Sequence, residues 1–464
     1  MGDVKYTPRY ETRGARMKPV GTTTQALTQN SQSARFSTLV PGTLTSHPWI
    51  PRALIFHALI FVAAFLIIYS RRPDAIANAQ FFAEDGEWYV DAYQYGIRSL
   101  LIPDPGGYLH TIPRLVALLS LSFPLMFAPL VMNLCAISIQ ILPVNLFLSS
   151  RFVNIALPMR LLASFLYLAL PNSFETNANV TTSQWHLALL ACMVLLARPT
   201  NERRWQVFDG LVLVLMSIES PIGVLLLPVA ASLWWIRRSR ISAIALAFLV
   251  PGAVIQVLTV LLSHSRQAAA NGASMTGLIT ILGGQIFLPS LLGRERLVSL
   301  VAGHPQHSLL IAESIATIVG LTLLLYAVRR GPTELKLFVV FAFAVLALAL
   351  IHPLAAAPNQ TQWESLSVPG CGNRYYFLPM IAFFAVLFWI VSSATTPQSL
   401  RCCAGVLLLL LPLGIRRDWR HQPFVDLHFR EYASEFESLP SGAKLVIPLN
   451  PVNSSHWAIE LSKH

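Results

Sequence analysis

The sequence predicts an all-α polytopic membrane protein. Of its 464 residues, 54% are hydrophobic and only 12% are charged, and the mean hydropathy is +0.57. Soluble domains carry about 25% charged residues, so this chain has too little polar surface to cover one soluble core. Long apolar runs recur between residues 53 and 414, as is typical of membrane-spanning helices.

The N-terminal part predicts a cytoplasmic tail and an anchor. Residues 1–52 are rich in Ser, Thr, Gln and Arg, and we expect a mostly disordered tail. The first apolar run, 53–70, lacks a small-residue cleavage site, which indicates an uncleaved signal anchor. Seven basic residues precede the run and place the N-terminus in the cytoplasm by the positive-inside rule: Lys5, Arg9, Arg13, Arg16, Lys18, Arg35 and Arg52.

Eleven spans are expected in the domain formed by residues 53–414. They lie at 53–70, 128–150, 159–173, 185–198, 206–218, 221–236, 241–263, 308–328, 336–353, 375–394 and 399–414. With this count the Arg-rich connections fall on the cytoplasmic side. The net charge of +11 is thereby explained by membrane orientation, and no nucleic-acid partner is predicted.

Residues 111–127 decide the topology. Counting them as a span would move the Arg-rich connections outside, so we interpret them as a helix lying at the outer face. The polar segments then fall together on the extracytoplasmic side: 71–127, 172–184, 264–307, 354–374 and 415–464. The last of these, with turn and strand signals, predicts a small extracytoplasmic cap.

Acidic residues gather in the first outer segment, 71–127. In a short helix, Glu84, Glu87 and Asp91 share one face, while Asp85 points about 100° away. Acids near a membrane surface mark chemistry more often than structure. The alternative is that they satisfy the N–H groups and dipole of the helix N-terminus.

Two further polar clusters are candidate binding sites. Residues 171–186 combine hydrogen-bonding side chains with one acid, Glu175, and suit a hydroxyl-rich ligand such as a sugar; an ordinary polar loop is the alternative. The candidate sugar-binding residues are Asn177, Asn179, Thr182, Gln184 and Trp185. In the second cluster Arg374 suits a phosphate at headgroup depth. Tyr375 and Tyr376 flank it or serve as interface anchors, and His110 and Arg114 are weaker candidates for the same phosphate.

The order of these elements resembles the GT-C superfamily of integral-membrane glycosyltransferases that use polyprenyl-phosphate-linked sugars. The resemblance rests on the anchor, the acidic motif, the second acid after the third span and the turn of residues 217–223, and it covers about residues 53–240. The segment 373–376 is a weaker match. The chain departs from the family by having Glu84-Asp85 where an Asp-Glu pair is usual, and by lacking a large C-terminal domain.

The resemblance implies a function and a location. An inverting transfer from a polyprenyl-phosphate sugar to a cell-envelope glycan or glycolipid is expected, on the outer face of a bacterial inner membrane. Asp85 is the expected general base, with Glu84 as its rival, and Glu175 orients the acceptor or a metal. A divalent cation, Mg²⁺ or Mn²⁺, is compatible with Asp85 and Glu175 as oxygen ligands.

Two other classes stay open. An O-antigen polymerase or ligase acts through arginines and histidine, and Arg266, Arg294 and Arg296 of the 264–307 segment keep that class in play. A lipid-linked sugar flippase or transporter carries ionisable residues inside its spans, for which His57 and Glu313 are the candidates.

Overall fold

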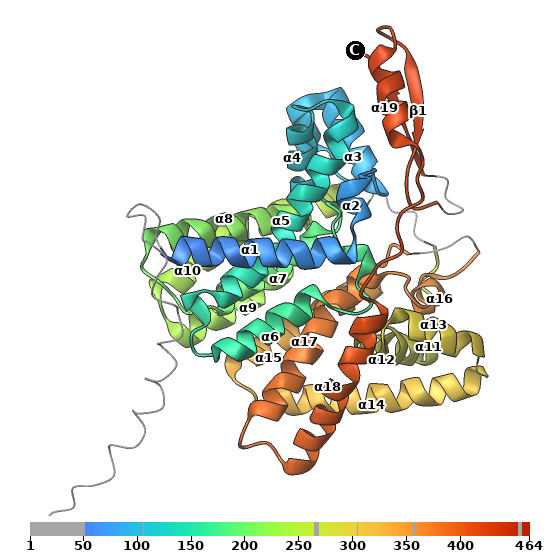
Figure 1. The fold of residues 1–464 in the computed structure, drawn as a ribbon. Coiled ribbons are helices and arrows are strands. Elements are labelled where there is room, and N and C mark those ends of the chain that lie inside the picture. Colours follow the sequence, from blue (N-terminus) through green and yellow to red (C-terminus); the bar gives the residue numbers. More distant parts are fainter. Residues whose placement is uncertain (1–51, 105, 264–268, 304, 356–358, 453–456) are drawn as a thin grey trace, which may run out of the picture. The chain divides into compact units, whose positions relative to one another are not determined.

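The computed structural model describes residues 52–104, 106–263, 269–303, 305–355, 359–452 and 457–464. Within these residues the chain is mostly helical, with one two-stranded sheet near its C-terminal end (Figure 1). The predicted tail of residues 1–52 lies outside the described residues, except for Arg52.

Every predicted span coincides with a helix. In order they are α1 (Arg52–Arg71), α5 (Ala128–Leu148), α6 (Leu157–Leu168), α7 (Ser183–Leu196), α8 (Arg203–Glu219), α9 (Ile222–Arg237), α10 (Arg240–Leu262), α14 (Gln306–Arg330), α15 (Thr333–Ile351), α17 (Asn373–Ser392) and α18 (Gln398–Arg417). By length and composition, eight helices of the described residues are able to cross a membrane, which indicates a multi-pass membrane protein. Seven of these belong to the predicted set, whereas α6, α7, α8 and α9 have only 12 to 17 residues. The count of eleven spans therefore stays a prediction.

The eighth long apolar helix, Met275–Leu292, was not predicted. Sequence reasoning treated 264–307 as a loop, but the segment contains α11 (Met275–Ile281), a π-helical stretch η5 (Leu282–Phe287), α12 (Leu288–Leu292) and α13 (Arg294–Gly303). Gly283, Gly284 and Pro289 interrupt the apolar pattern, and such residues are typical of a connection between helices. The two glycines also allow close packing, because a Cβ at either position would meet Glu313 of α14 at under 3 Å.

Both ends of this helix are attached to the same group of polar segments. Just before it, Asn271 accepts a hydrogen bond from the Trp363 N–H at 3.0 Å, and just after it, the Arg294 N–H donates to Asp418 at 2.6 Å. Trp363 and Asp418 belong to two segments, 354–374 and 415–464, that the sequence places on one side of the membrane. The Met275–Leu292 helix thus begins and ends beside the segments predicted to be extracytoplasmic.

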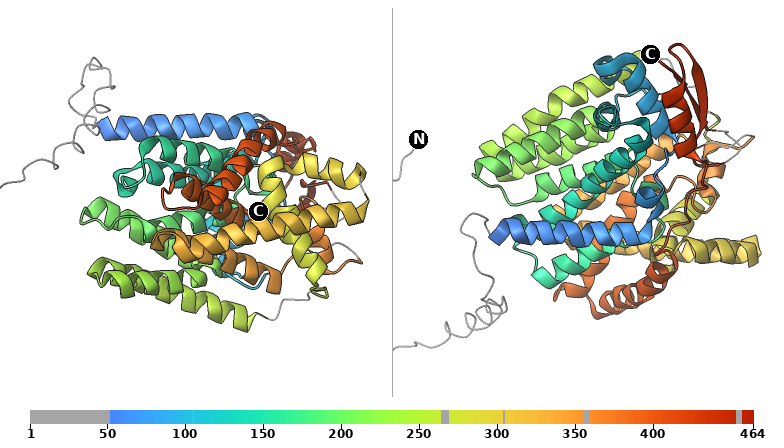
Figure 2. Two further views of the ribbon diagram at one scale, coloured as in Figure 1. Left: turned by 90° about the horizontal axis from the view of Figure 1, so that it is seen from below. Right: turned by 45° about the horizontal axis from the view of Figure 1, so that its top comes forward.

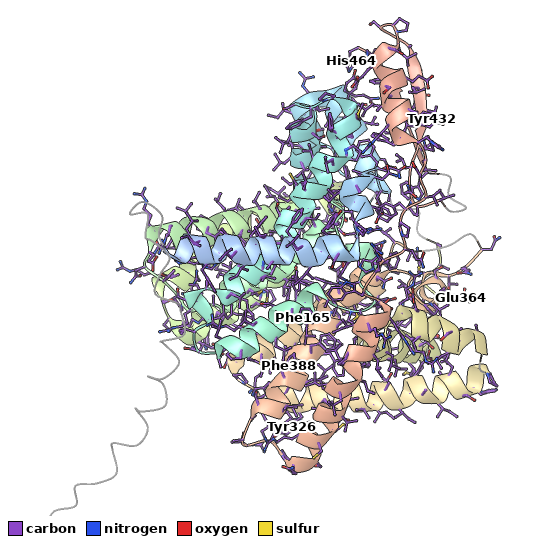
Figure 3. All side chains as sticks on the ribbon, viewed as in Figure 1. Phe165, Tyr326, Glu364, Phe388, Tyr432 and His464 are labelled. Carbon is purple, nitrogen blue, oxygen red and sulfur yellow. The ribbon has the colours of Figure 1, made fainter. Side chains whose placement is uncertain are left out.

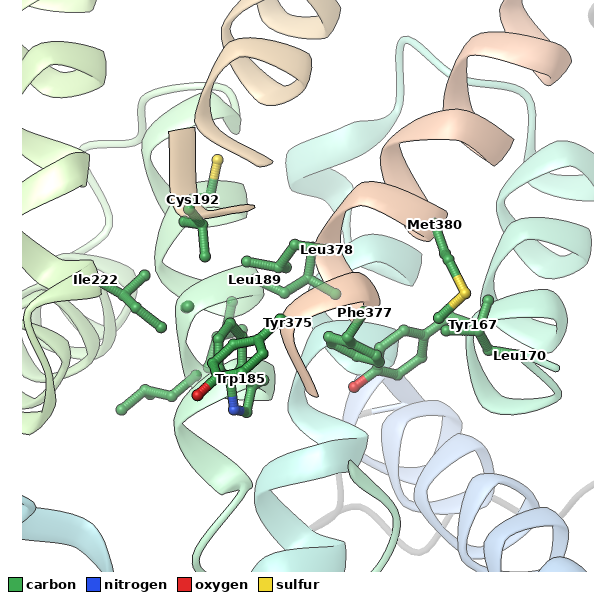
Figure 4. Packing of buried hydrophobic residues seen from close by; sticks show 14 of the residues in the cluster. Tyr167, Leu170, Trp185, Leu189, Cys192, Ile222, Tyr375, Phe377, Leu378 and Met380 are labelled. Carbon is green, nitrogen blue, oxygen red and sulfur yellow. The ribbon is translucent and has the colours of Figure 1, made fainter. Parts of the chain in front are cut away.

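The interior of the helical domain is built around α7 and α17. Nearly all residues of α7 are buried, as expected of a helix that is apolar around its whole circumference. Figure 4 shows Trp185, Leu189 and Cys192 of α7 packed beside Tyr375 and Leu378 of α17. Outward-facing side chains of α1 and α14 are largely exposed, which suits contact with lipid. Figure 3 shows the side chains on all helices, with Tyr326 of α14 and Phe388 of α17 labelled.

The first outer segment forms a small helical unit. It contains α2 (Asp74–Ala77), α3 (Glu84–Tyr95), η1 (Gly96–Leu101), α4 (Thr111–Ser120) and η2 (Leu125–Phe127). α3 and α4 pack side by side (Figure 2). With ten residues α4 is too short to cross a bilayer alone, in keeping with the predicted interfacial helix. Two more short elements, η3 (Ser150–Phe152) and η4 (Phe174–Thr176), lie between the following spans.

The C-terminal segment folds against this unit. It contains α19 (Phe429–Ser438) and an antiparallel pair, β1 (Lys444–Pro448) and β2 (Ala458–Ser462), while α16 (Gln362–Ser367) lies in the segment before α17. The parallel bridge between Phe82 and Asn450 brings the C-terminal chain beside the start of α3, and the Ala83 N–H donates to the Asn450 carbonyl at 2.5 Å. The cap therefore touches the acidic motif. Its strand β1 lies where the sequence predicts a short strand, whereas β2 was not predicted.

Candidate functional site

One cavity of about 860 Å³ is lined by side chains from all five polar segments. Glu84, Glu175, Arg294, Arg374 and Asp418 each come from a different one of these segments. The sequence grouped the segments by topology alone, and the structure brings them into contact around a single space.

Membrane helices complete the wall of this site cavity. Ile222 of α9, Val260 of α10 and three residues of α15, Val345, Leu348 and Ala349, line it together with the polar side chains. The cavity therefore offers charged and hydrogen-bonding groups on one part of its surface and hydrocarbon on another. Such a lining suits an amphiphilic ligand.

Glu84 and Asp85 point in different directions. Glu84 lines the cavity, whereas Asp85 does not. The Asp85 carboxylate is buried and accepts hydrogen bonds from the Thr181 N–H at 2.9 Å and the Thr181 hydroxyl at 2.6 Å. Burial raises the pKa of Asp85 to about 7, and the Thr181 hydrogen bonds partly oppose this rise. The geometry favours Glu84 over Asp85 as the carboxylate that meets a ligand, which reverses the order of preference drawn from the sequence.

Glu175 and Arg374 are partners. Their side chains form an ion pair, and the Arg374 N–H donates to the second Glu175 oxygen at 3.2 Å. Arg374 also donates to the Leu354 carbonyl at 2.8 Å. Both side chains line the cavity, but each neutralises much of the charge of the other. Neither is the independent acid or phosphate-binding group that the sequence suggested.

Arg72 is a buried cation that faces the cavity and that sequence reasoning missed. It is 2% exposed, and it donates to the carbonyls of Phe174 at 3.1 Å and Asn177 at 2.9 Å. Its Nε has no hydrogen-bond partner, and no ion pair of the described residues includes it. Its guanidinium lies 4.0 Å from the ring centroid of Phe424. A signal existed, because an arginine directly after the first span, on the predicted outer side, contradicts the positive-inside rule.

Arg294 lies near Arg72. Its guanidinium lies 4.4 Å from the ring centroid of Phe174, the residue whose carbonyl binds Arg72. The pKa of His421 lies well below its usual value. Burial is the largest cause, and the positive charges of Arg71, Arg72 and Arg294 add to it. His421 is therefore neutral at pH 7. The cavity as a whole is lined by five carboxylates and four arginines, so the positive charge is local to the surroundings of His421. There it favours an anionic group of a ligand.

Of the remaining candidates for phosphate binding, two line the cavity and two are buried in the packing of the helices. Arg114 is buried between helices, where it pairs with Asp91 at 2.8 Å and lies 4.6 Å from the Trp88 ring centroid, so it does not reach the cavity. His110 lines the cavity, and burial together with Arg114 lowers its pKa to about 3. Tyr375 lines the cavity, whereas the buried Tyr376 donates to the Leu366 carbonyl at 2.9 Å.

Three of the five predicted sugar-binding residues line the cavity, and two are buried in the loop. Thr182, Gln184 and Trp185 line the cavity. Asn179 accepts hydrogen bonds from the Thr182 N–H at 3.0 Å and its hydroxyl at 2.7 Å, and Asn177 donates to His421 at 3.1 Å. Asn177 and Asn179 are buried and hold the loop in shape, so they act on a ligand only through their neighbours.

The expected metal ligands do not form a shared set. Asp85 is bound to Thr181 outside the cavity lining, and Glu175 is bound to Arg374. Across the part of the chain that the structure describes, no group of three or more His, Cys, Asp or Glu side chains is arranged to hold a metal ion. The structure thus does not bring Asp85 and Glu175 together as ligands of one cation, and the divalent cation stays a prediction.

The transporter candidates lie away from the cavity. Glu313 of α14 accepts a hydrogen bond from the Thr280 hydroxyl at 2.9 Å, and His57 of α1 lies 3.1 Å from the Asn145 side-chain oxygen. Neither residue lines the cavity, so neither brings an ionisable group to the amphiphilic space.

No protein-family model matches this chain, and the search of curated proteins gave no match to its sequence.

Proposed function

We propose that the protein is a membrane glycosyltransferase that moves a sugar from a polyprenyl-phosphate donor to a cell-envelope glycan or glycolipid. One observation carries the proposal: a single cavity joins carboxylates, arginines and aromatic side chains to the apolar side chains of membrane helices. A lipid-linked sugar has the same sequence of chemical groups, namely hydrocarbon, phosphate and sugar.

Glu84 is the proposed general base. It takes the proton of the acceptor hydroxyl while the acceptor oxygen bonds to the anomeric carbon. The bond from that carbon to the phosphate oxygen breaks, and the phosphate leaves with the electron pair. The sugar is attacked from the side opposite the phosphate, so its anomeric configuration is inverted.

Arg72 and Arg294 are the proposed binding groups for the departing phosphate. Cations held in a buried site stabilise the charge that grows on the leaving oxygen. Arg374 is less suited to this role because Glu175 already neutralises it. Trp185 and Tyr375 line the same cavity as apolar surfaces against which a sugar ring can pack.

The test compares envelope glycans from a deletion strain complemented with wild type, Glu84→Gln or the control Glu87→Gln, at equal expression. Glu87 is on the same helix but does not line the cavity. We expect Glu84→Gln to lower product by about 10²-fold or more, the usual contribution of a general base, and Glu87→Gln to leave it nearly unchanged. Full product with Glu84→Gln would refute the assignment of the base.

A second candidate is an enzyme of the O-antigen polymerase or ligase type. The observation in its favour is the set of basic side chains that line the cavity, which includes Arg72, Arg294, Arg420 and His421. In that class the arginines and histidine carry the reaction. Loss of product with His421→Gln but not with Glu84→Gln would favour this candidate.

A further inference from the structure

A second cavity, of about 530 Å³, lies between α7, α8, α9 and α10. It is at the other end of these helices from the site cavity. In α9, Ile222 lines the site cavity and Arg237 lines the second one, and in α10 the corresponding residues are Val260 and Ser242. On α9 the nearest lining residues of the two cavities are Ile222 and Ala230, eight positions or about 12 Å apart along the helix.

The wall of the second cavity includes apolar side chains that the protein leaves uncovered. Val207 and Leu211 of α8 are 54% and 59% exposed, and Ile244 and Phe248 of α10 are 53% and 41% exposed. In a membrane protein such side chains meet lipid chains. The cavity is therefore a hollow in the lipid-facing surface of the helices.

One end of the hollow is basic. Arg151 is neutralised by Asp209, which accepts two hydrogen bonds at 3.1 and 3.0 Å. Arg237 donates to the carbonyls of Leu195 and Leu196 and lies 3.8 Å from Glu334.

Arg203 supplies charge that no carboxylate offsets. It lines the cavity, is exposed, and takes part in no ion pair of the described residues. The N-terminal ends of α8 and α10 lie at this end together with the C-terminal ends of α7 and α9, so the helix dipoles largely cancel and the net charge comes from Arg203. A basic end beside an uncovered apolar wall matches the headgroup and chain of an acidic lipid.

We propose that this second cavity binds one anionic phospholipid. One acyl chain lies along Leu211 and Phe248, and the headgroup phosphate lies at Arg203 and Arg237. A zwitterionic lipid fits less well, because its ammonium group adds positive charge beside these arginines. The inference concerns lipid binding alone and does not depend on the proposed transferase activity.

Native mass spectrometry of the purified full-length protein in detergent tests the proposal. Phosphatidylglycerol and phosphatidylcholine with identical chains are supplied in equal amounts, and lipid retained per chain is measured. We expect one phosphatidylglycerol per chain in preference to phosphatidylcholine. Arg203→Gln lowers its retention about fivefold, the effect of one basic residue at a lipid headgroup. Leu211→Trp fills the hollow and lowers retention of both lipids.

Two matched variants separate a specific site from general attraction. Arg330→Gln removes an exposed arginine from α14, and Leu409→Trp enlarges an exposed side chain of α18, both outside the second cavity. Each should retain lipid as the wild type does. Equal losses from Arg330→Gln and Arg203→Gln, or equal retention of the two lipids by the wild type, would overturn the proposal. Because Arg203 is exposed, its variant remains informative even if Leu211→Trp impairs folding.

Discussion

Asp85 is an acid whose surroundings disfavour its charge. It is buried, and its pKa of about 7 lies above the value of about 3.9 for an exposed aspartate. Folded protein therefore binds more protons than unfolded protein between these two pH values. The contribution of Asp85 to the free energy of unfolding is greatest below about pH 4 and decreases as the pH rises through 7.

Asp85→Asn should remove this pH dependence. The Asn side-chain oxygen still accepts from Thr181, but no charge forms at high pH. We expect the variant to be more stable than wild type at pH 8, by at most about 4 kcal/mol, and to differ little near pH 4. Thermal unfolding in detergent at the two pH values measures the difference. Glu435→Gln, at an exposed site, is the control, and a wild-type pH dependence retained in Asp85→Asn would contradict this account.

At the scale of elements, the C-terminal segment is tied to the chain that precedes α3. Gln80 is 4% exposed, donates to the Val425 carbonyl at 3.2 Å and accepts from the Leu427 N–H at 2.8 Å. The Asn450 side chain donates to the same Val425 carbonyl at 3.0 Å. These bonds hold the segment beside Ala83, whose φ of 47° fixes the direction in which α3 starts.

Gln80→Ala should loosen this attachment. It leaves the buried side of the 425–427 chain without two hydrogen bonds, a loss of about 1–3 kcal/mol. We expect faster cleavage by trypsin after Arg430 than in wild type, followed by mass spectrometry of the fragments. Gln398→Ala, an exposed position on α18, serves as the control. An unchanged cleavage rate in Gln80→Ala would show that the backbone bridge alone holds the segment.

At the scale of the whole molecule, the polar segments converge on one cavity although they are far apart in sequence. Asp418 illustrates how they are held. Its carboxylate accepts from the N–H groups of Asn172 at 2.8 Å and Arg294 at 2.6 Å. Three segments thus meet at one side chain, and both ends of the Met275–Leu292 helix contact segments that the sequence predicts to be extracytoplasmic.

Cysteine labelling tests the prediction that both ends of Met275–Leu292 lie on the same side of the membrane. In a variant whose five cysteines are replaced, single cysteines at exposed Ser274, Ser299, Glu435 and Thr333 are treated with a membrane-impermeant maleimide. We expect positions 274, 299 and 435 to react from the same side, and 333, in the connection between α14 and α15, only from the other. Opposite accessibility of 274 and 299 would mean that Met275–Leu292 crosses the bilayer.

Much of the architecture can be predicted from the sequence, because a membrane helix is recognised from its own consecutive residues. An apolar run is a property of consecutive residues, and every predicted run coincides with a helix. The Met275–Leu292 helix was missed because its Gly283-Gly284 pair resembles a connection. The role of these glycines, which is to allow close packing against Glu313 of α14, is visible only in the tertiary structure. The C-terminal cap was predicted as a small unit, but α19 and its packing on the first outer segment were not.

The sequence by itself determined the membrane class, the positions of most long helices and the grouping of the five polar segments that line one cavity. Only the tertiary structure decided which side chains in those segments face the cavity. Glu84 and Asp85 are adjacent, and their directions depend on how α3 is held by Asn450 and Thr181. The pairing of Glu175 with Arg374 joins residues 199 positions apart. Such choices depend on contacts between distant residues, which hydropathy and spacing along the chain do not contain.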